Sequence, residues 1–345
     1  MDTNFLQNLH NNYKEKSLYG KWIRHEQILP LMEGLQDKFK VAQVGSSEED
    51  RSIHSLDFGT GPMKILIWTQ MHGNESTGTK AVFDLLNVLV SDNEIGKTLE
   101  SVCTIKIIPM LNPDGAEQYT RVNANEVDLN RDAVAVSAEE SKVLQTVLDD
   151  FQPKFCFNMH DQRTIFGVEG THNPATLSFL APSEEVTKQI TPGRKETMNV
   201  IVAMNSIVQQ FIPNGVGRYT DEFYPTATGD NFQKMGYNTI LIESGHFPKD
   251  YVREKSREFT FYALLSGLHH IATTTSFNDY EPYFDIPNNN KDFLDVIHRF
   301  SNKADEGYQY EDVILENQLV SRLRKVELLD VSGKIGHFEI VFDNE

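Results

Sequence analysis

Four apolar segments, each followed at once by polar residues, constrain the fold of this chain most. Residues 64–71 (KILIWTQM) precede HGNE, 104–110 (TIKIIPM) precede LNPDG, 154–159 (KFCFNM) precede HDQR, and 238–242 (NTILI) precede ESGH. Continuous apolar runs of this length are typical of strands that are buried on both faces of a sheet. Two further segments have strand character, Ile53–Phe58 and Thr176–Ala181.

Helical patterns separate these strands. They are clearest at Ser76–Val90, Ala138–Asp150, Arg194–Phe211 and Tyr251–Ile271. Strands that alternate with helices favour an α/β fold, with a mixed, mostly parallel central sheet covered by helices on both faces. Residues 1–40, where polar and apolar residues mix at helical spacing, are also expected to be helical.

The C-terminal part differs in pattern from the rest of the 345 residues. Asn278–Asn290 is rich in Asn, Asp and Pro and indicates a linker. A helical stretch is expected after it, followed by short strands at Lys325–Leu329 and His337–Phe342. We therefore expect a main domain over residues 1–275 and a small α+β extension of unknown role over residues 276–345.

Charge and apolar patterning exclude some classes of partner. Fifty acidic residues against thirty-two basic ones give a formal charge of −18, which disfavours binding to nucleic acid or to anionic membranes. No segment approaches the roughly 18 apolar residues of a membrane span, and no signal peptide is recognisable, so a cytoplasmic location is expected. Cys103 and Cys156 lie in apolar runs and are expected to be buried free thiols. The oligomeric state is left open.

The polar residues that follow the four apolar runs should lie together, because open α/β sheets bind ligands at the carboxyl ends of their strands. His72 and Glu75, three residues apart, offer the nitrogen and oxygen donors of a catalytic zinc site, and His160 offers a third. Each residue has a plain alternative as an ordinary structural side chain. Glu243 ends a buried strand, where it could be a proton acceptor or a salt-bridged carboxylate.

The segment 112–132 (NPDGAEQYTRVNANEVDLNRD) carries further candidates. Asn130 and Arg131 offer an amide and a guanidinium that could bind a substrate carboxylate. Arg121 could stabilise an oxyanion, and Asp128 could orient a metal-binding histidine. The alternative for this segment is a polar surface loop.

The ordered set HGNE, NPDG, RVNANEVDLNR, MHD and IESG resembles the zinc carboxypeptidase family, metallopeptidase family M14, from about residue 46 to residue 245. The resemblance implies one zinc ion per chain, bound by His72, Glu75 and His160. It also implies that Glu243 is the general base of a hydrolase with a carboxypeptidase-like α/β fold.

The same resemblance assigns residues to the substrate. Arg121 becomes the oxyanion partner, Asn130 and Arg131 become the binders of the terminal carboxylate, and Asp128 takes the position that orients a histidine. Tyr224 matches the mobile tyrosine of the family, with Tyr219 as a possible substitute. Apart from the resemblance, we expect a specificity pocket near Asp230 and Asn231, where a carboxylate would favour a basic or otherwise amine-bearing terminal residue.

The chain departs from the digestive enzymes of the family in three ways, of which the first implies trimmed loops and the other two put peptide specificity in question. The gap between the second and third ligands is shorter, Asn74 replaces an arginine, and Gln162 followed by Arg163 replaces a tyrosine. The compact motifs also resemble the aspartoacylase and succinylglutamate desuccinylase branch. We therefore expect a zinc-dependent metallocarboxypeptidase, with an N-acyl amino acid amidohydrolase and a non-catalytic peptide-binding protein as the alternatives. The substrate would be a peptide or N-acyl amino acid with a free carboxylate.

Overall fold

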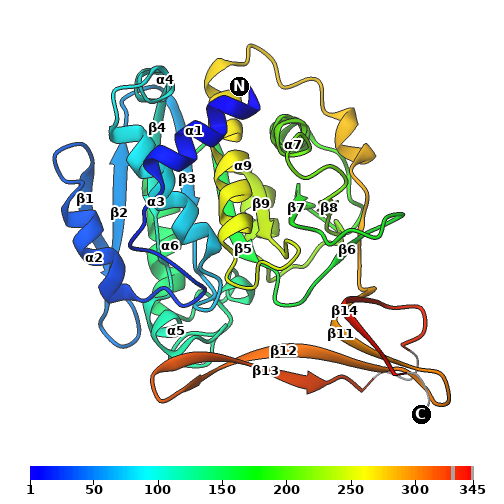
Figure 1. Ribbon diagram of the computed structural model, residues 1–345. Helices are drawn as coiled ribbons and strands as arrows, with labels where there is room; N and C mark the ends of the chain where they lie inside the picture. The colour runs from blue at the N-terminus through cyan, green and yellow to red at the C-terminus, as the bar shows by residue number, and fades with distance from the viewer. Residues whose placement is uncertain (328–330, 343–345) are drawn as a thin grey trace.

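The computed structural model describes residues 1–327 and 331–342. Its centre is an eight-stranded sheet in the order β1-β2-β4-β3-β5-β9-β7-β8 (Figure 1). The strands of this sheet are β1 (Lys40–Ser46), β2 (Ser52–Phe58), β3 (Met63–Trp68), β4 (Cys103–Ile108), β5 (Phe155–Asp161), β7 (Leu177–Leu180), β8 (Val216–Arg218) and β9 (Asn238–Ser244). Strands β4, β3, β5 and β9 run parallel in the middle, whereas β1, β2 and the β7–β8 pair add antiparallel contacts.

Helices cover both faces of the sheet, as the alternating pattern predicts. The helices are α1 (Thr3–Tyr13), α2 (His25–Glu33), α3 (Thr77–Val90), α4 (Glu94–Val102), α5 (Pro113–Gln118), α6 (Glu139–Phe151), α7 (Pro192–Val208), α8 (Thr228–Lys234) and α9 (Glu254–Thr273). Ile65 and Ile67 face the larger core with α3, α7 and α9, and Leu66 and Trp68 face the smaller core with α6 and α8. This alternation along β3 fixes its register between the two helical layers.

Local sequence explains several boundaries that position the site. NPDG, which indicates a turn, begins α5: Asn112 caps the helix by accepting a hydrogen bond from the amide of Gly115 at 2.8 Å, and Pro113 occupies the first turn. Cys103 and Cys156 are buried free thiols, as expected. Among the described residues, no helix is long and apolar enough to span a bilayer. The cytoplasmic location stays a prediction.

The linker after α9 packs on the main domain. It forms the 3₁₀ helix η2 (Glu281–Asp285), in which Tyr283 is buried and accepts a hydrogen bond from the amide of Ala181 at 3.1 Å. It ends in β10 (Asn289–Asn290), which pairs with β6 (Gly167–Val168). The domain division at residue 276 stays a prediction.

The expected helical stretch after the linker is wrong. The chain forms a four-stranded sheet in the order β13-β12-β11-β14, from β11 (Phe293–Phe300), β12 (Glu306–Leu315), β13 (Gln318–Lys325) and β14 (Ile335–Phe342). Leu294 and Ile297 of β11 form a small core with Val331. Strand β11 also carries the aromatic and β-branched residues Phe293, Val296 and Phe300, which favour strands. The described part of the extension is therefore all-β except for η2. The strand expected at His337–Phe342 is confirmed. The strand expected at Lys325–Leu329 is wrong where the structure describes it, because β13 ends at Lys325 and residues 326 and 327 are not in a strand; Leu329 lies outside the described residues.

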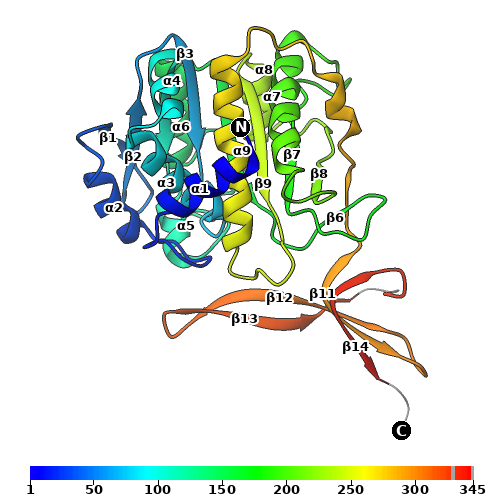
Figure 2. The same cartoon turned by 45° about the horizontal axis from the view of Figure 1, so that its top comes forward.

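The C-terminal sheet lies across one end of the main domain (Figure 2). Contacts identify this end as the one at which β9 ends: the Tyr251 hydroxyl donates to Asp295 at 2.8 Å, and the amide of Lys249 donates to Nε2 of His337 at 3.0 Å. Lys21 forms an ion pair with Asp312 of β12. The extension is thus attached to the loops at the carboxyl ends of the parallel strands.

Candidate metal centre

His72, Glu75 and His160 meet at the carboxyl ends of β3 and β5. His72 and Glu75 lie in the loop between β3 and α3, and His160 lies near the end of β5. One donor atom from each of the three lies within 4.8 Å of the others, and all three side chains are buried. Gly73 places the loop: a Cβ atom there would lie 1.9 Å from the backbone of Gly115, so the HGNE and NPDG motifs pack directly on each other.

The three donors fit a zinc ion. His72 Nδ1 lies 2.9 Å from one oxygen of Glu75, His160 Nδ1 lies 2.8 Å from the other, and the two Nδ1 atoms are 3.1 Å apart. Asp128 accepts a hydrogen bond from His72 Nε2 at 3.0 Å, which leaves the lone pair of Nδ1 directed at the centre. Two imidazoles and one carboxylate are a donor set that a catalytic zinc site uses.

The charged groups of the cluster shift the pKa values of their neighbours. Burial alone would raise the pKa of Glu75, but the neighbouring imidazoles of His72 and His160 hold it well below its usual range. Burial would likewise raise the pKa of Asp128, and its contacts with His72 and Arg121 lower it instead. Both carboxylates are therefore kept in the ionised form that binds a cation.

Glu243 lies beside this cluster on the next strand. Strands β5 and β9 are parallel neighbours, and Glu243 is the register partner of His160. Its side chain is half-buried. Burial, and then the negative charges of Glu75 and Asp161, raise the pKa of Glu243 well above its usual range. A carboxyl group with a raised pKa beside three metal-type donors is suited to proton transfer.

Arg121 contacts the candidate ligands. Its Nη1 lies 3.1 Å from Glu75 and 3.1 Å from Nδ1 of His72, and its Nε donates to Asp128 at 3.0 Å. The guanidinium is therefore fixed by Asp128 with its positive charge beside the donors. Its role toward an oxyanion stays a prediction.

Asn130 and Arg131 lie on the short helix η1 (Leu129–Arg131), which follows Asp128. The side-chain oxygen of Asn130 accepts a hydrogen bond from the amide of Thr228 at 3.2 Å, which ties η1 to α8. Arg131 is exposed, and its guanidinium carbon lies 5.8 Å from the centre of the Tyr224 ring. Arg131, one of the two residues predicted to bind the substrate carboxylate, therefore faces solvent beside Tyr224.

The two candidate tyrosines face different groups. Tyr224 is 45% exposed and lies beside Arg131. Burial, and then the charges of Glu243 and Glu75, raise the pKa of Tyr219, so its hydroxyl lies within the electrostatic reach of the metal centre. The pKa of Tyr219, named as a substitute, thus responds to the carboxylates, whereas Tyr224 lies beside Arg131.

Asp230 and Asn231 hold a loop together. Asp230 accepts a hydrogen bond from the amide of Tyr224 at 2.9 Å, and burial raises the pKa of its carboxyl group to about 6. Asn231 donates to the carbonyls of Pro225 and Ala227, each at 2.8 Å. These groups fix residues 224–227, and their roles in substrate specificity stay predictions. The same holds for Arg163, which is exposed.

Sequence reasoning missed two charged residues behind the centre. The amide of Asp161 donates to Glu75 at 3.0 Å, and its carboxylate accepts from the amide and the hydroxyl of Thr77. Arg253 donates to the carbonyl of Ser244 at 2.8 Å and to that of Gln162. Asp161 could have been found, since it directly follows His160. No sequence motif includes Arg253, because its contacts with Ser244 and Gln162 form only when the chain is folded.

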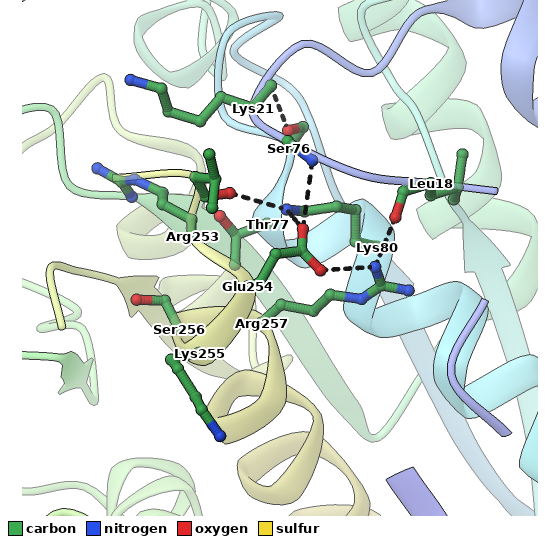
Figure 3. A network of polar contacts seen from close by, with 12 residues as sticks. Leu18, Lys21, Ser76, Thr77, Lys80, Arg253, Glu254, Lys255, Ser256 and Arg257 are labelled. Atoms are coloured by element: carbon green, nitrogen blue, oxygen red, sulfur yellow. Dashed lines mark hydrogen bonds and ion pairs between the residues drawn. The ribbon is translucent and has the colours of Figure 1, made fainter. Parts of the chain in front are cut away.

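A charged network supports the loop of Glu75 from the side of α9 (Figure 3). Lys80 of α3 donates to Glu254 at 2.7 Å, and Arg257 donates to the carbonyl of Leu18 at 2.6 Å. The hydroxyl of Ser76 donates to the carbonyl of Lys21 at 2.5 Å. The N-terminal segment is thereby fixed against the residue that directly follows Glu75.

Comparison with known proteins agrees with this geometry. Residues 27–176 match the zinc carboxypeptidase family, Peptidase_M14. The chain is 29% identical over 100 residues to a probable carboxypeptidase 2 of Arthroderma benhamiae, which covers 28% of this chain and 19% of that protein. It is 26% identical over 130 residues to carboxypeptidase SOL1 of Arabidopsis thaliana, covering 33% and 26%. The matched segments thus span about a quarter or less of these relatives' lengths.

Solved structures share the fold. A metallo-carboxypeptidase from Burkholderia cenocepacia aligns with a TM-score of 0.59 at 20% identity, covering 72% of this chain and 69% of that one. Carboxypeptidase A from Helicoverpa armigera aligns with a TM-score of 0.58 at 16% identity, covering 79% and 80%. Residues 27–176 thus match the zinc carboxypeptidase family, Peptidase_M14, and the chain shares the fold of solved carboxypeptidases.

Proposed function

We propose that this protein is a zinc-dependent metallocarboxypeptidase that hydrolyses the C-terminal amide bond of peptides. The observation that carries the proposal is the convergence of His72, Glu75 and His160 on one buried centre, with Glu243 as the register partner of His160. One zinc ion per chain would be held by those three side chains. When bound, zinc supplies a Lewis acid that polarises a carbonyl and lowers the pKa of water.

The chain's own residues account for the proton transfers. Glu243 accepts a proton from the water whose oxygen attacks the amide carbon. It then gives that proton to the amine nitrogen as the carbon–nitrogen bond breaks, so the base is regenerated in its starting form. Arg121, fixed by Asp128, places a positive charge beside the centre where the carbonyl oxygen becomes negative. Asp128 keeps the tautomer of His72 fixed throughout.

Asn130 and Arg131 make the proposed reaction exo-acting. Arg131 is exposed beside Tyr224 and can bind a free carboxylate with two parallel hydrogen bonds. Asn130 is held by the amide of Thr228, which fixes the position of the clamp relative to α8. A substrate without a free terminal carboxylate would lose this anchor. Peptides with an amidated C-terminus should therefore be poor substrates.

The test combines metal analysis with a library of peptides that differ in their C-terminal residue. Wild type is expected to contain one zinc per chain and to release single C-terminal residues. Glu243→Gln should keep the metal and lose at least about a thousandfold in rate, in line with the removal of a general base. Glu281→Gln, an exposed Glu-to-Gln control on η2, should behave as wild type.

Other outcomes lead to other functions. Zinc without peptide trimming, together with hydrolysis of N-acetyl or N-succinyl amino acids, would assign the protein to N-acyl amino acid hydrolysis. Zinc-loaded protein that binds peptide carboxylates and hydrolyses no amide would indicate a non-catalytic binding protein. A chain that binds no metal at this centre would rule out the proposed mechanism.

A further inference from the structure

A polar cavity of about 300 Å³ lies at the end of β8, outside the groups used above except for Tyr219. It is lined by Arg218, Tyr219, Thr220, Asp221, Asn288 and Asn289. The segment that leads into β10 forms one wall: the amide of Arg218 donates to the carbonyl of Pro287 at 2.8 Å, and Arg218 forms a bridge with Asn288. The linker after α9 therefore helps to build a cavity of the main domain.

The guanidinium of Arg218 carries a charge that the protein does not neutralise. Among residues 1–327 and 331–342 it has no carboxylate within ion-pair distance, and its side chain donates only to the neutral amide oxygen of Asn288, at 3.2 Å. Its Nε is buried and lacks a hydrogen-bond partner within the same residues. The group lies over the rings of Tyr283 and Phe284, at 5.2 and 5.5 Å from their centres. Aromatic stacking holds a guanidinium in place without consuming its hydrogen-bond donors.

The one acidic residue of the cavity is already paired. Asp221 forms ion pairs with Arg194 at 3.1 Å and with Lys188 at 3.3 Å. The cavity therefore keeps a positive charge in a chain with a formal charge of −18. An uncompensated cation in such a chain points to an anionic ligand, because the overall field disfavours anions elsewhere on the surface.

Asn289 supplies a second unpaired donor. Its side-chain oxygen accepts a hydrogen bond from the hydroxyl of Ser178 at 3.0 Å, and its buried Nδ2 has no partner in the described part of the chain. Gly217 leaves room for this amide, since a Cβ atom there would lie 1.8 Å from the oxygen of Asn289. Two fixed donors without acceptors match the acceptor-only chemistry of a carboxylate.

The cavity lies within substrate reach of the metal centre. Gln162, two residues after His160, donates to Ser178 at 2.9 Å, so a chain of hydrogen bonds leads from β5 to Asn289. Strand β8 is separated from β9 only by β7. Neighbouring strands are about 4.8 Å apart, which places β8 roughly 10 Å from β9, or about three residues of an extended peptide at about 3.3 Å per residue. Tyr219 lines the cavity, and the charges of Glu243 and Glu75 contribute, after burial, to its raised pKa.

We infer that this cavity, which we call the Arg218 subsite, binds a second carboxylate of the substrate, in addition to the terminal one. Arg218 and Asn289 would bind an acidic side chain that lies within about three residues of the scissile bond. The inference rests on the proposed peptidase function for its substrate, and it names the class: peptides with an aspartate or glutamate close to the C-terminus.

The test uses pairs of peptides that are identical except for glutamate or glutamine at one position near the C-terminus. Wild type should prefer the glutamate peptide at one position by about ten- to a hundredfold in kcat/KM, as expected for a hydrogen bond between charged groups. Arg218→Met should abolish that ratio, and Arg218→Lys should restore part of it. Asn289→Asp, which adds a negative charge of the same shape, should invert it. Arg322→Met, at an exposed arginine of β13, should keep the wild-type ratio.

Binding of the same labelled peptide pairs, measured by fluorescence anisotropy, separates this inference from the proposed function. Should no peptide be cleaved, tighter binding of the glutamate peptide in wild type, lost in Arg218→Met, would still support the Arg218 subsite. Equal binding and equal cleavage of the two peptides by wild type at every position would overturn it. So would a glutamate preference that survives in a folded Arg218→Met protein.

Discussion

At the scale of single residues, the metal centre depends on side chains that fix other side chains. Asp128 contacts both His72 and Arg121, so one carboxylate sets the tautomer of a candidate ligand and the position of a guanidinium. Arg253 also fixes other groups near the centre. It joins the carbonyls of Gln162 and Ser244, which follow His160 and Glu243 at the ends of two neighbouring strands.

We therefore expect Arg253 to act as a positioning residue. Arg253→Met should lower kcat by about tenfold or more with a smaller change in KM, because a shift of the base relative to the ligands affects the reaction more than substrate binding. Arg253→Lys should recover part of kcat, since one ammonium group can reach one of the two carbonyls. Steady-state kinetics on the best library peptide measure both. A rise in KM alone would instead place Arg253 in substrate binding.

Individual residues also show how far sequence reasoning reaches. The candidate metal-binding residues and Glu243 were predictable because His160 and Glu243 lie near the ends of apolar strands and His72 and Glu75 follow one, and parallel strands end at the same edge of a sheet. Arg253 was not, since it lies ten residues beyond Glu243 at the start of a helix and contacts β5 only through the fold. The loop-fixing contacts of Asp230 and Asn231 were missed for a similar reason, because a polar residue in a loop does not reveal whether its partner is backbone or substrate.

At the scale of secondary structure, long apolar patterns predict the elements correctly, whereas the short or half-exposed segments β1 and β11 are not predicted. The predicted ranges of α3, α6, α7 and α9 agree closely with the structure. The half-exposed strand β1 was missed, because its residues show no clear alternation. Strand β11 was mistaken for a helix, because the few apolar residues of a short segment fit either period. Its pairing with β12 and β14 decides the outcome, and pairing between distant segments is not visible in one sequence.

The start of α9 yields a pH prediction. Burial would raise the pKa of Glu254, but Lys80, Lys14 and Arg257 lower it to about 2. A carboxyl group with a depressed folded-state pKa stabilises the protein above its unfolded-state pKa, and this stabilisation is lost as the pH falls from about 4.5 to about 2. A shift of this size corresponds to about 3 kcal/mol.

Glu254→Gln should therefore lower the free energy of unfolding at pH 7 by about 2–3 kcal/mol. The difference from wild type should shrink as the pH falls toward 2, because wild type then loses the same charge. Urea unfolding of both proteins at several pH values measures this difference directly. Glu281→Gln, which changes an exposed carboxylate, should match wild type throughout. A wild-type–variant difference that does not depend on pH would contradict the assigned role of the charge.

At the scale of the whole molecule, the N-terminal segment connects the loop that carries His72 and Glu75 to the C-terminal sheet. The carbonyl of Lys21 accepts a hydrogen bond from Ser76, directly after Glu75, and its ammonium group forms an ion pair with Asp312 of β12. The Tyr119 hydroxyl also donates to Asp312, at 3.3 Å, and Tyr119 lies two residues before Arg121. The hairpin β12–β13 is thus attached to two segments that carry site residues.

This arrangement predicts that one ion pair controls how firmly the hairpin is attached. The Lys21 and Asp312 side chains are only 16% and 19% exposed, so reversing one charge leaves two like charges in a poorly solvated contact. Lys21→Asp and Asp312→Lys should each raise amide hydrogen exchange in β12 and β13 by about tenfold or more. The double variant should recover protection, because it restores an ion pair of opposite polarity.

Arg324→Glu, which breaks an exposed pair with Glu311 in the same hairpin, should change exchange much less. If the double variant exchanges as fast as either single one, the hairpin is held by other contacts, such as that of Tyr251 with Tyr310 of β12, and the ion pair contributes little.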